Sequence, residues 1–416
     1  MRPTVRNIKD VYPAAQTETQ LQRYRAAEIG FAEHFGELGA HRFFSAPGRT
    51  EICGNHTDHN NGKVFAASVD LDVIAVVEQT DDGFVTIKSD GFPEDKIDIN
   101  DLDVHEDEKN TSASLIRGVL KGFRKNGHKI GSFRAYTTST VMKGSGLSSS
   151  AAFEVLVGTI LTHLYNGGQI SPVKIAQIAQ FAENAYFGKA SGLMDQMACS
   201  YGGFVAIDFK DNDIPVIENL QIDFEKYKHA LCIVDTKGDH ADLSDEYSAI
   251  PNEMKAIAGF FDCETLRSLS LDDIMLNINV LRDKFGDRAV LRAIHFFHEN
   301  ERVEKVVHAL KHEEFDNFLL SVKESGDSSF KYLQNIYANS DIKHQCLSIG
   351  LNIAENTLHR KGACRVHGGG FAGTIQAFVP FEAIKQFRMN MEKVFGIGSC
   401  HILSIRNVGG CEVLIS

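Results

Sequence analysis

Apolar residues recur at helical or strand-like spacing along much of the 416-residue chain. Residues 17–36 carry apolar side chains three and four positions apart, and residues 112–124 repeat this pattern, so we expect helices there. Residues 64–69 and 73–77 are instead rich in β-branched side chains, which predicts strands. A further apolar strand is expected at 229–236, followed by helices to about residue 360.

Two pairs of predicted strands are separated by short connections. Residues 73–77 and 84–88 flank the turn residues 81–83, which favours a hairpin. Residues 401–406 and 411–415 are expected to form a closing strand pair.

A segment rich in glycine and serine joins a predicted strand, residues 132–141, to a predicted helix that ends before Gly167-Gly168. A helix start carries unpaired N–H groups and the positive end of the helix dipole, so it favours an anion. The segment therefore predicts a phosphate-binding loop, with an ordinary turn and a serine N-cap as the alternative. The expected ATP-binding residues are Gly144, Ser145, Gly146, Leu147, Ser148, Ser149 and Ser150.

This loop differs from two common nucleotide-binding patterns. It lacks the Gly-x-x-x-x-Gly-Lys-Ser/Thr spacing, and Ser149 stands where a dinucleotide fingerprint has its third glycine. A nucleotide held here would be bound by backbone dipoles and hydroxyl groups rather than by a Walker lysine.

A second polar segment, residues 42–62, contains charged, hydroxyl, amide and imidazole side chains together with glycines. Because these side chains need hydrogen-bond partners, we do not expect the segment to form a core element. A surface loop is one interpretation, but the apolar strands that follow favour a ligand site.

Two further segments carry groups that suit a site. Asp195 lies between two methionines, and a buried aspartate serves as a cap, an ion-pair partner or a catalytic group; taken alone, the pattern favours the structural roles. Four glycines in residues 368–373 permit a backbone turn that side chains would prevent, with a flexible turn as the alternative.

Composition and charge narrow the class of protein. The chain is 43% hydrophobic and 24% charged, and its net charge of −12 argues against nonspecific binding to nucleic acid or to anionic membranes. No apolar run approaches about 18 residues, and the first residues show no signal-peptide pattern. The 8 cysteines are scattered without a Cys-x-x-Cys pair, so we expect reduced thiols in a cytoplasmic protein.

Three motifs, in this order, resemble those of the GHMP small-molecule kinases. They are Ser45–Arg49 with Gly54–Gly62, then Gly144–Ala152, then Gly368–Gly373. The first is similar to the galactokinase signature specifically. The resemblance implies ATP-dependent phosphorylation of the anomeric C1 hydroxyl of a sugar. It also implies an α+β fold of two domains, with mixed sheets flanked by helices and the active site between them; we place the domains at residues 1–207 and 208–416.

The resemblance also implies roles for single residues. Asp195 matches the catalytic aspartate of the family and Arg49 its catalytic arginine. Ser150 and Glu183 match ligands of the implied metal, Mg²⁺, with Ser149 as the neighbouring candidate. An arginine close to Asp195 would lower the pKa of its carboxyl group and keep it a base at neutral pH. The residues expected to contact the sugar are Asn55, His56, Asp58, Gly192 and Tyr247.

Three positions depart from the family pattern. Asn55 stands where galactokinases usually carry a glutamate that receives the C6 hydroxyl of the sugar, so a hydrogen-bond donor is added and a negative charge is lost. A C6 carboxylate would then be repelled less. Met142 replaces the usual proline before the glycine loop, and residues 248–252 replace an arginine-rich helix start.

The expected function is that of a galactokinase, which makes galactose 1-phosphate and ADP from D-galactose and ATP. One alternative is a sugar 1-kinase for a related pyranose, such as N-acetylgalactosamine or galacturonate. Another is a regulator that binds galactose and ATP without catalysis. We expect ATP and a monosaccharide as partners, Mg²⁺ as cofactor, no nucleic acid or membrane, and a monomeric chain.

Overall fold

The computed structural model of the chain describes residues 5–141, 146–189, 191–220, 222–238, 243–339 and 341–415, with backbone alone for Glu225 and Ser244. The helices are α1 (Ile8–Val11), α2 (Thr17–Phe35), α3 (Ser112–Lys125), α4 (Ser149–Tyr165), α5 (Pro172–Ala182), α6 (Met194–Tyr201), α7 (Ser244–Phe260), α8 (Leu271–Leu276), α9 (Ile278–Phe285), α10 (Asp287–Lys311), α11 (Phe315–Ser328), α12 (Cys346–Leu358) and α13 (Ile384–Phe395). In these ranges, the longest apolar stretches of helix fall short of what a bilayer crossing requires.

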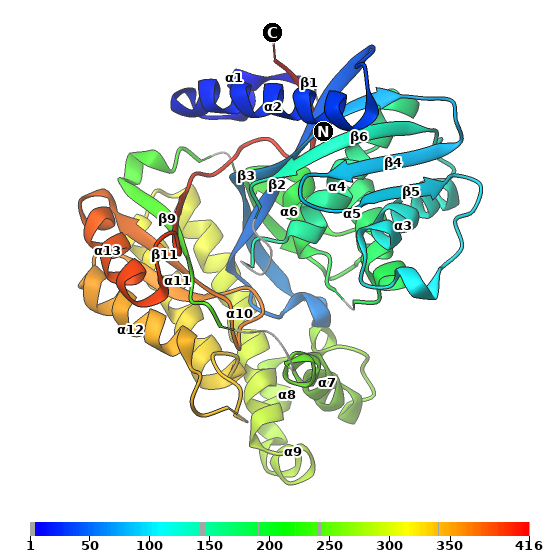
Figure 1. The fold of residues 1–416 in the computed structure, drawn as a ribbon. Coiled ribbons are helices and arrows are strands. Elements are labelled where there is room, and N and C mark those ends of the chain that lie inside the picture. Colours follow the sequence, from blue (N-terminus) through cyan, green and yellow to red (C-terminus); the bar gives the residue numbers. More distant parts are fainter. Residues whose placement is uncertain are drawn as a thin grey trace.

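The strands are β1 (Val5–Asn7), β2 (His41–Cys53), β3 (Lys63–Gln79), β4 (Phe84–Ser89), β5 (Glu94–Asp98), β6 (Phe133–Ser139), β7 (Phe204–Asp208), β8 (Val216–Leu220), β9 (His229–Asp235), β10 (Ala363–His367), β11 (Thr374–Pro380), β12 (Cys400–Leu403) and β13 (Cys411–Leu414). Among the described residues they form two sheets (Figure 1). The larger, mixed sheet has the order β1-β13-β2-β3-β6-β4-β5, and β7 and β8 continue from β3. The smaller sheet has the order β10-β11-β9-β12. The α+β fold is therefore confirmed.

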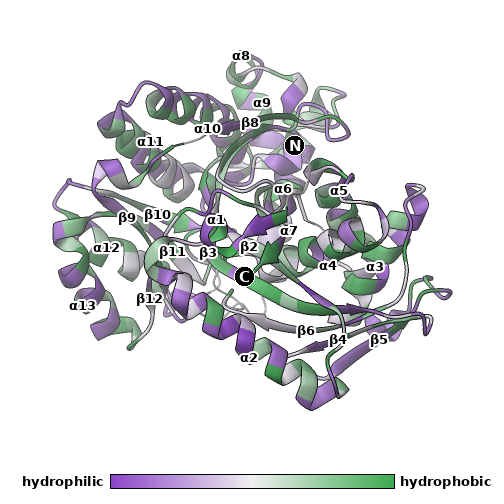
Figure 2. Cartoon of the chain, turned by 90° about the horizontal axis from the view of Figure 1, so that it is seen from above, coloured by the Kyte–Doolittle hydropathy of each residue, from purple (hydrophilic) through white to green (hydrophobic). Residues whose placement is uncertain are grey.

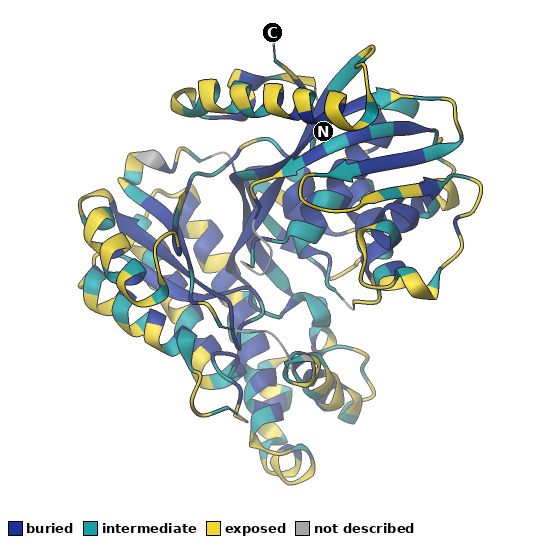
Figure 3. Ribbon diagram, in the orientation of Figure 1, coloured by how far each residue is buried: buried dark blue, intermediate teal, exposed yellow. Residues whose placement is uncertain are grey.

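Strands β2 and β3 are buried because helices cover both faces of the larger sheet. Successive side chains of a strand point to opposite faces. Phe43 and Ile74 accordingly pack with α2 on one face, whereas Phe44 and Ala75 belong to the core on the other face, where α4 lies. Figure 3 shows both strands buried and the outer side of α2 exposed, and Figure 2 shows hydrophilic and hydrophobic residues on this same helix.

The smaller sheet is also covered on both faces. Side chains of β9 and β11 pack on α12 and α13 on one face. On the other face, Leu231, Ile233 and Phe378 join the core that continues into the larger sheet through α10 and α11. One hydrophobic core therefore links the two sheets, and the functional motifs are anchored on either side of it.

The helices expected at 17–36 and 112–124 are confirmed as α2 and α3. The predicted hairpin of residues 73–77 and 84–88 is wrong, because β6 lies between β3 and β4 and runs parallel to β4. β6 alternates buried and partly buried side chains along most of its length. It is an inner strand, because one edge pairs with β3 and the other with β4. β4 instead forms its antiparallel pair with β5.

The predicted pairing of the last two strands is also wrong. β12 pairs with β9 in the smaller sheet, whereas β13 inserts between β1 and β2 in the larger one. Residues 64–69 and 73–77 belong to a single strand, β3, which is 17 residues long. These strands pair with segments that are distant in the sequence. The residues of a local turn do not indicate such partners.

Candidate active site

Residues 45–53 form the second half of β2 and are buried. Our expectation that this polar segment would not form a core element was wrong, because its side chains meet partners from distant strands. The side chains of Thr50 and His367 are hydrogen-bonded at 3.1 Å, and a guanidinium nitrogen of Arg365 lies 3.2 Å from a carboxylate oxygen of Glu51. A polar strand can thus be buried when each polar group is paired.

Arg49 and Asp195 form a close ion pair. The Nε and Nη2 atoms of Arg49 lie 2.7 and 2.6 Å from Oδ1 of Asp195, and Nη1 donates to the carbonyl of Gly146. Burial alone would raise the pKa of Asp195, but the charges of Arg49 and Lys189 and a hydrogen bond from Ser148 outweigh it. The pKa of Asp195 therefore lies below its ordinary value, and the carboxylate is ionised at neutral pH, as expected from the sequence.

The start of α4 faces this pair. Ser148 is the residue before the helix; its hydroxyl donates to Oδ2 of Asp195 and accepts no hydrogen bond from the first turn of α4. A serine-capped turn, the alternative weighed for this loop, is therefore not what forms. Gly146 has a φ of 68°, and a Cβ there would press against His367 and Thr374. Gly144 and Ser145 lie outside the described residues.

Ser150 and Glu183 lie together, as the motif comparison implied. The Ser150 hydroxyl donates to Oε1 of Glu183 at 2.8 Å, and the ammonium of Lys189 donates to the same oxygen at 2.9 Å. The amide of Gln196 donates to the other oxygen at 2.8 Å. Glu183 begins a π-helical turn, Glu183–Phe187, that continues from α5. Such turns are frequent at functional sites.

This pair suits a hard divalent cation. Mg²⁺ takes oxygen ligands and is usually held by one or two carboxylates together with phosphate oxygens. Ser150 and Glu183 supply a hydroxyl and a carboxylate oxygen beside the start of α4. Within the described ranges, this site included, no three His, Cys, Asp or Glu side chains gather closely enough to hold a metal ion by themselves. The donor set therefore fits a metal that shares its ligands with a bound phosphate chain.

His56, Asp58 and Gly192 form a second group. Only glycine fits at position 192, because a Cβ there would overlap the carboxylate of Asp58. Nε2 of His56 donates to the carbonyl of Gly369 at 3.0 Å. Burial, followed by the neighbouring His59, lowers the pKa of His56 to about 3, so the imidazole is neutral and Nδ1 is an acceptor. Asp58 and His56 thus offer hydrogen-bond acceptors of the kind that sugar hydroxyls require.

Three of the residues expected to contact the sugar donate hydrogen bonds to successive backbone carbonyls of the glycine turn between β10 and β11. Asn55 donates to Gly368 at 2.8 Å, His56 donates to Gly369, and the hydroxyl of Tyr247 donates to Gly370 at 2.7 Å. Burial raises the pKa of Tyr247 to about 12, so the hydroxyl stays protonated. The first and third motifs are therefore one connected unit.

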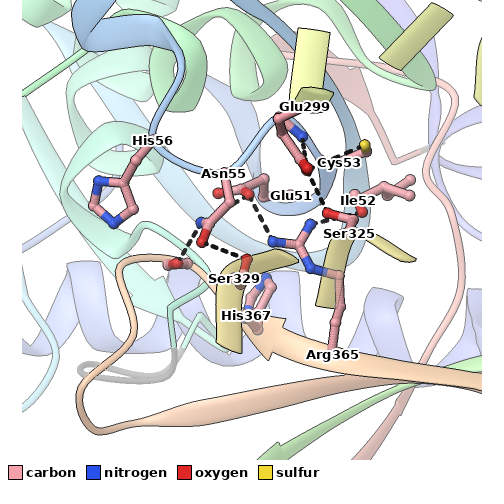
Figure 4. Close-up of polar contacts among 12 residues, drawn as sticks. Glu51, Ile52, Cys53, Asn55, His56, Glu299, Ser325, Ser329, Arg365 and His367 are labelled. Carbon is pink, nitrogen blue, oxygen red and sulfur yellow. Dashed lines mark hydrogen bonds and ion pairs between the residues drawn. The ribbon is translucent and has the colours of Figure 1, made fainter. Parts of the chain in front are cut away.

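Asn55 is fully buried and uses its whole hydrogen-bonding capacity (Figure 4). Its amide nitrogen donates to Glu51 at 3.0 Å as well as to Gly368. Its amide oxygen accepts from Ser329 at 3.2 Å and from Asn335 at 2.8 Å. A sugar contact through this side chain would have to replace one of these four bonds.

Three residues of the site were not predicted from the sequence. Lys189 and Gln196 hold Glu183, and Arg365 neutralises Glu51. Ser148 was predicted as a nucleotide-binding residue, and the structure adds its hydrogen bond to Asp195. Gln196 directly follows Asp195 and Lys189 precedes it by six positions, so closeness in sequence was an available signal for these two. Arg365 carried no such signal, because 314 residues separate it from Glu51.

Comparison with protein families agrees with this geometry. Residues 30–79 match the galactokinase galactose-binding signature, and residues 114–203 match the N-terminal domain of the GHMP kinases. The first range contains Arg49, Asn55, His56 and Asp58, and the second contains the α4 loop, Glu183 and Asp195. The chain is 30% identical to a galactokinase of Lacticaseibacillus paracasei over 376 residues, covering 88% of this chain and 92% of that protein. It is 29% identical to a galactokinase of Streptomyces coelicolor, covering 85% and 88% of the two chains.

Solved structures share the fold. The galactokinase of Lactococcus lactis, crystallised with galactose, superimposes with a TM-score of 0.80 at 23% identity, over 93% of this chain and 99% of that one. A mevalonate kinase of Methanococcus jannaschii gives a TM-score of 0.63 at 14% identity, over 89% and 100%.

Proposed function

Because the chain belongs to the galactokinase family of the GHMP kinases, we propose that it transfers the γ-phosphoryl group of ATP to the C1 hydroxyl of D-galactose. The observation that carries this proposal is the Arg49–Asp195 pair, which faces the start of α4 beside Ser150 and Glu183. An ionised base and an anion-binding helix start thus lie at one place, as phosphoryl transfer to a hydroxyl requires.

Asp195 accepts the proton of the C1 hydroxyl in this mechanism. The C1 oxygen then forms a bond to the γ-phosphorus, and the bond from that phosphorus to the bridging oxygen of ADP breaks. Arg49 keeps Asp195 ionised and in place, because two of its nitrogens contact the same carboxylate oxygen. Ser148 holds the second oxygen of Asp195. The carboxylate therefore needs no rearrangement before it takes the proton.

Ser150 and Glu183 would hold the divalent cation, which we propose to be Mg²⁺. Bound there, it would neutralise charge on the phosphate chain. Gln196 donates a hydrogen bond to Oε2 of Glu183, which keeps Oε1 directed at Ser150. The N–H groups at the start of α4 complete the phosphate site, since the Ser148 side chain leaves them to a ligand.

Asp58, His56, Gly192 and Tyr247 are proposed to bind the sugar. Asp58 accepts hydrogen bonds from hydroxyl groups, and Gly192 lets the chain approach it closely. The neutral His56 supplies an acceptor at Nδ1.

A related pyranose is the second candidate, and position 55 is the reason to test it. The negative charge absent at Asn55 is present on Glu51, whose oxygen lies 3.0 Å from the amide nitrogen of Asn55. Arg365 balances that charge, so this cluster offers no spare cation to a C6 carboxylate. The arrangement therefore favours the neutral C6 hydroxyl of galactose over galacturonate.

A sugar panel with a coupled ADP assay tests the proposal. We expect turnover with galactose to exceed that with N-acetylgalactosamine, galacturonate or glucose. If another sugar gives the highest kcat/KM, the galactose assignment is lost but the kinase assignment stands. If no sugar releases ADP from a folded protein that binds ATP, the chain is a binding protein and both assignments fail. Asn55→Glu then shows whether position 55 controls the preference.

Three coarser features are proposed alongside. We propose domains at residues 1–207 and 208–416, a monomer in solution and a cytoplasmic location. Light scattering after size exclusion measures the mass of the particle, for which a monomer gives 46.0 kDa.

A further inference from the structure

Lys189 reaches the candidate active site from the partly exposed surface of the molecule. It follows the π-helical turn that begins at Glu183, and 55% of its side chain is exposed. Its ammonium nevertheless lies 2.9 Å from Oε1 of Glu183, the oxygen that also accepts from the Ser150 hydroxyl at 2.8 Å. One carboxylate oxygen therefore serves a lysine and the candidate metal ligand Ser150 at once.

Two carboxylates attract the ammonium of Lys189. Burial of part of the side chain would lower the pKa of Lys189, but the charges of Glu183 and Asp195 outweigh it and raise this pKa. Arg49 is the other cation of this group, but its nitrogens are committed to Asp195 and to the Gly146 carbonyl. Lys189 has three N–H donors, and the described residues supply one hydrogen-bond partner, Glu183. Lys189 is thus the cation with donors to spare.

A purely structural role would be a weak explanation for this contact. A pair in which one partner is half exposed gains little for the fold, because solvent screens it and a long side chain must be ordered. Phosphoryl transfer, by contrast, is accelerated mainly by cations placed against the transferring group. Lys189 acts electrostatically on both Glu183 and Asp195, the proposed metal ligand and the proposed base.

We infer that Lys189 is a further catalytic residue: its ammonium binds Glu183 in the free enzyme and moves to the oxygens of the transferring phosphoryl group when a divalent cation takes Glu183. This inference rests on the proposed function, since it needs a phosphoryl group in transit. Lys189 keeps its protons throughout. The proton of the C1 hydroxyl still goes to Asp195, the C1 oxygen bonds to the γ-phosphorus, and ADP leaves.

The exchange follows from charge. An ammonium and a divalent cation repel each other and compete for one carboxylate oxygen. Lys189 carries its charge on a four-carbon stem with rotatable donors, and its exposed surface leaves room for that stem to turn. The ammonium would thereby pair with the charge of Glu183 before the nucleotide binds and stabilise the transition state afterwards.

Lys189→Met separates this role from a structural one, because it changes two measurements in opposite directions. We expect kcat to fall by about 100-fold, with the KM for the sugar nearly unchanged. We also expect Mn²⁺, followed by electron paramagnetic resonance in the complex with ADP, to bind several-fold more tightly, because the competing ammonium is gone and no γ-phosphate is present. Lys189→Arg should recover part of kcat.

Lys109→Met is the matched control. Lys109 lies beside Gly188 in the same region, but its ammonium pairs with the exposed Glu106 at 2.6 Å. The same charge is therefore lost without touching Glu183, and we expect wild-type kcat and Mn²⁺ binding. Thermal melting of both variants should match the wild type.

Two results would overturn the inference: an unchanged kcat in Lys189→Met, or a loss of Mn²⁺ binding together with kcat, which would make Lys189 a support for Glu183. The sugar assignment fails separately. If galactose is not the preferred sugar, the same comparison is made with the sugar that is, because Lys189 acts on the phosphoryl group.

Discussion

Two polar clusters lie beside the glycine turn, and their central side chains differ in burial and in the hydrogen-bonding capacity that remains. In the cluster around Asn55, which includes Glu51, Asn335 and Arg365, side chains are fully buried and Asn55 has four protein partners. In the cluster around Asp195, the carboxylate is partly exposed, and Lys189 has donors beyond its bond to Glu183.

This difference indicates that one cluster has a structural role and the other a role in binding and catalysis. Groups whose bonding capacity is filled by protein position the backbone, because a ligand gains nothing by displacing a good bond. Groups with capacity left over, in a partly open place, can bind and react. Each cluster includes residues of the first motif, Arg49 in one and Glu51 with Asn55 in the other, so membership of that motif does not separate them.

The largest expected effect comes from Asp195→Asn, in the cluster with spare capacity. Asparagine keeps the shape and the hydrogen bond from Ser148 but cannot take a proton, so we expect kcat to fall about 10⁴-fold, equivalent to about 5.5 kcal/mol. Calorimetry should still show ATP binding by the folded protein, although the urea midpoint should fall because the buried Arg49 loses its anion. Residual activity within tenfold of the wild type would contradict the role of Asp195.

Arg365→Met should affect stability instead. Glu51 would be left buried and without its cation, which costs about 3–5 kcal/mol of the free energy of unfolding. Urea unfolding followed by circular dichroism measures this loss, and kcat per folded molecule should change only a few-fold. Arg282→Met is the control, because Arg282 pairs with Asp287 at an exposed place. Equal stability of the two variants would show that the buried cluster is not a structural support.

Gly192→Ala tests the fit between the sugar-binding residues. The added Cβ would overlap the carboxylate of Asp58 and push it from its position. Losing hydrogen bonds to a charged acceptor costs about 1.5–3 kcal/mol, so we expect the KM for the sugar to rise more than tenfold, with a smaller change in kcat. Gly259→Ala is the matched control, since a Cβ there meets nothing within 4 Å. An unchanged KM would remove Gly192 and Asp58 from the sugar site.

The most gradual effect is a pH dependence of stability from His56, which follows Asn55 and donates to the carbonyl of Gly369. Its pKa is about 3 in the folded protein against an ordinary 6.5, so below pH 6.5 the unfolded chain binds the extra proton. The free energy of unfolding should therefore fall as the pH drops from 6.5 toward 3, by at most about 1.4 kcal/mol per pH unit. His56→Gln should flatten this slope, whereas His344→Gln, at an exposed place, should not. Parallel slopes for all three proteins would contradict a neutral His56.

The sequence predicted the parts of this molecule that depend on local patterns. Helices α2 and α3 follow from their apolar spacing, and the motif residues Arg49, Ser150, Glu183 and Asp195 were identified and lie together. What failed depends on contacts between distant segments. The turn after β3 looked like a hairpin because nothing local reveals that β6 would take the neighbouring place.

The burial of residues 45–53 failed as a prediction for the same reason. A run of polar side chains indicates exposure unless partners are known, and the partners of Glu51 and Thr50 come from β10 and β11, more than 300 residues later. The saturated state of Asn55 was equally hidden, because Ser329 and Asn335 lie on a different part of the chain.

The place of β13 has a consequence for how the protein is made. Cys411 pairs with Ser45, four residues before Arg49, and β13 also carries β1 on its other edge. Because β13 is synthesised more than 350 residues after Ser45, the strand that holds Arg49 lacks one neighbour while most of the chain between them is made. The N-terminal part of a growing chain can collapse early, but the larger sheet stays open at this edge until β13 arrives. A variant truncated before Cys411 should therefore lack the strand that supports β2 and lose activity.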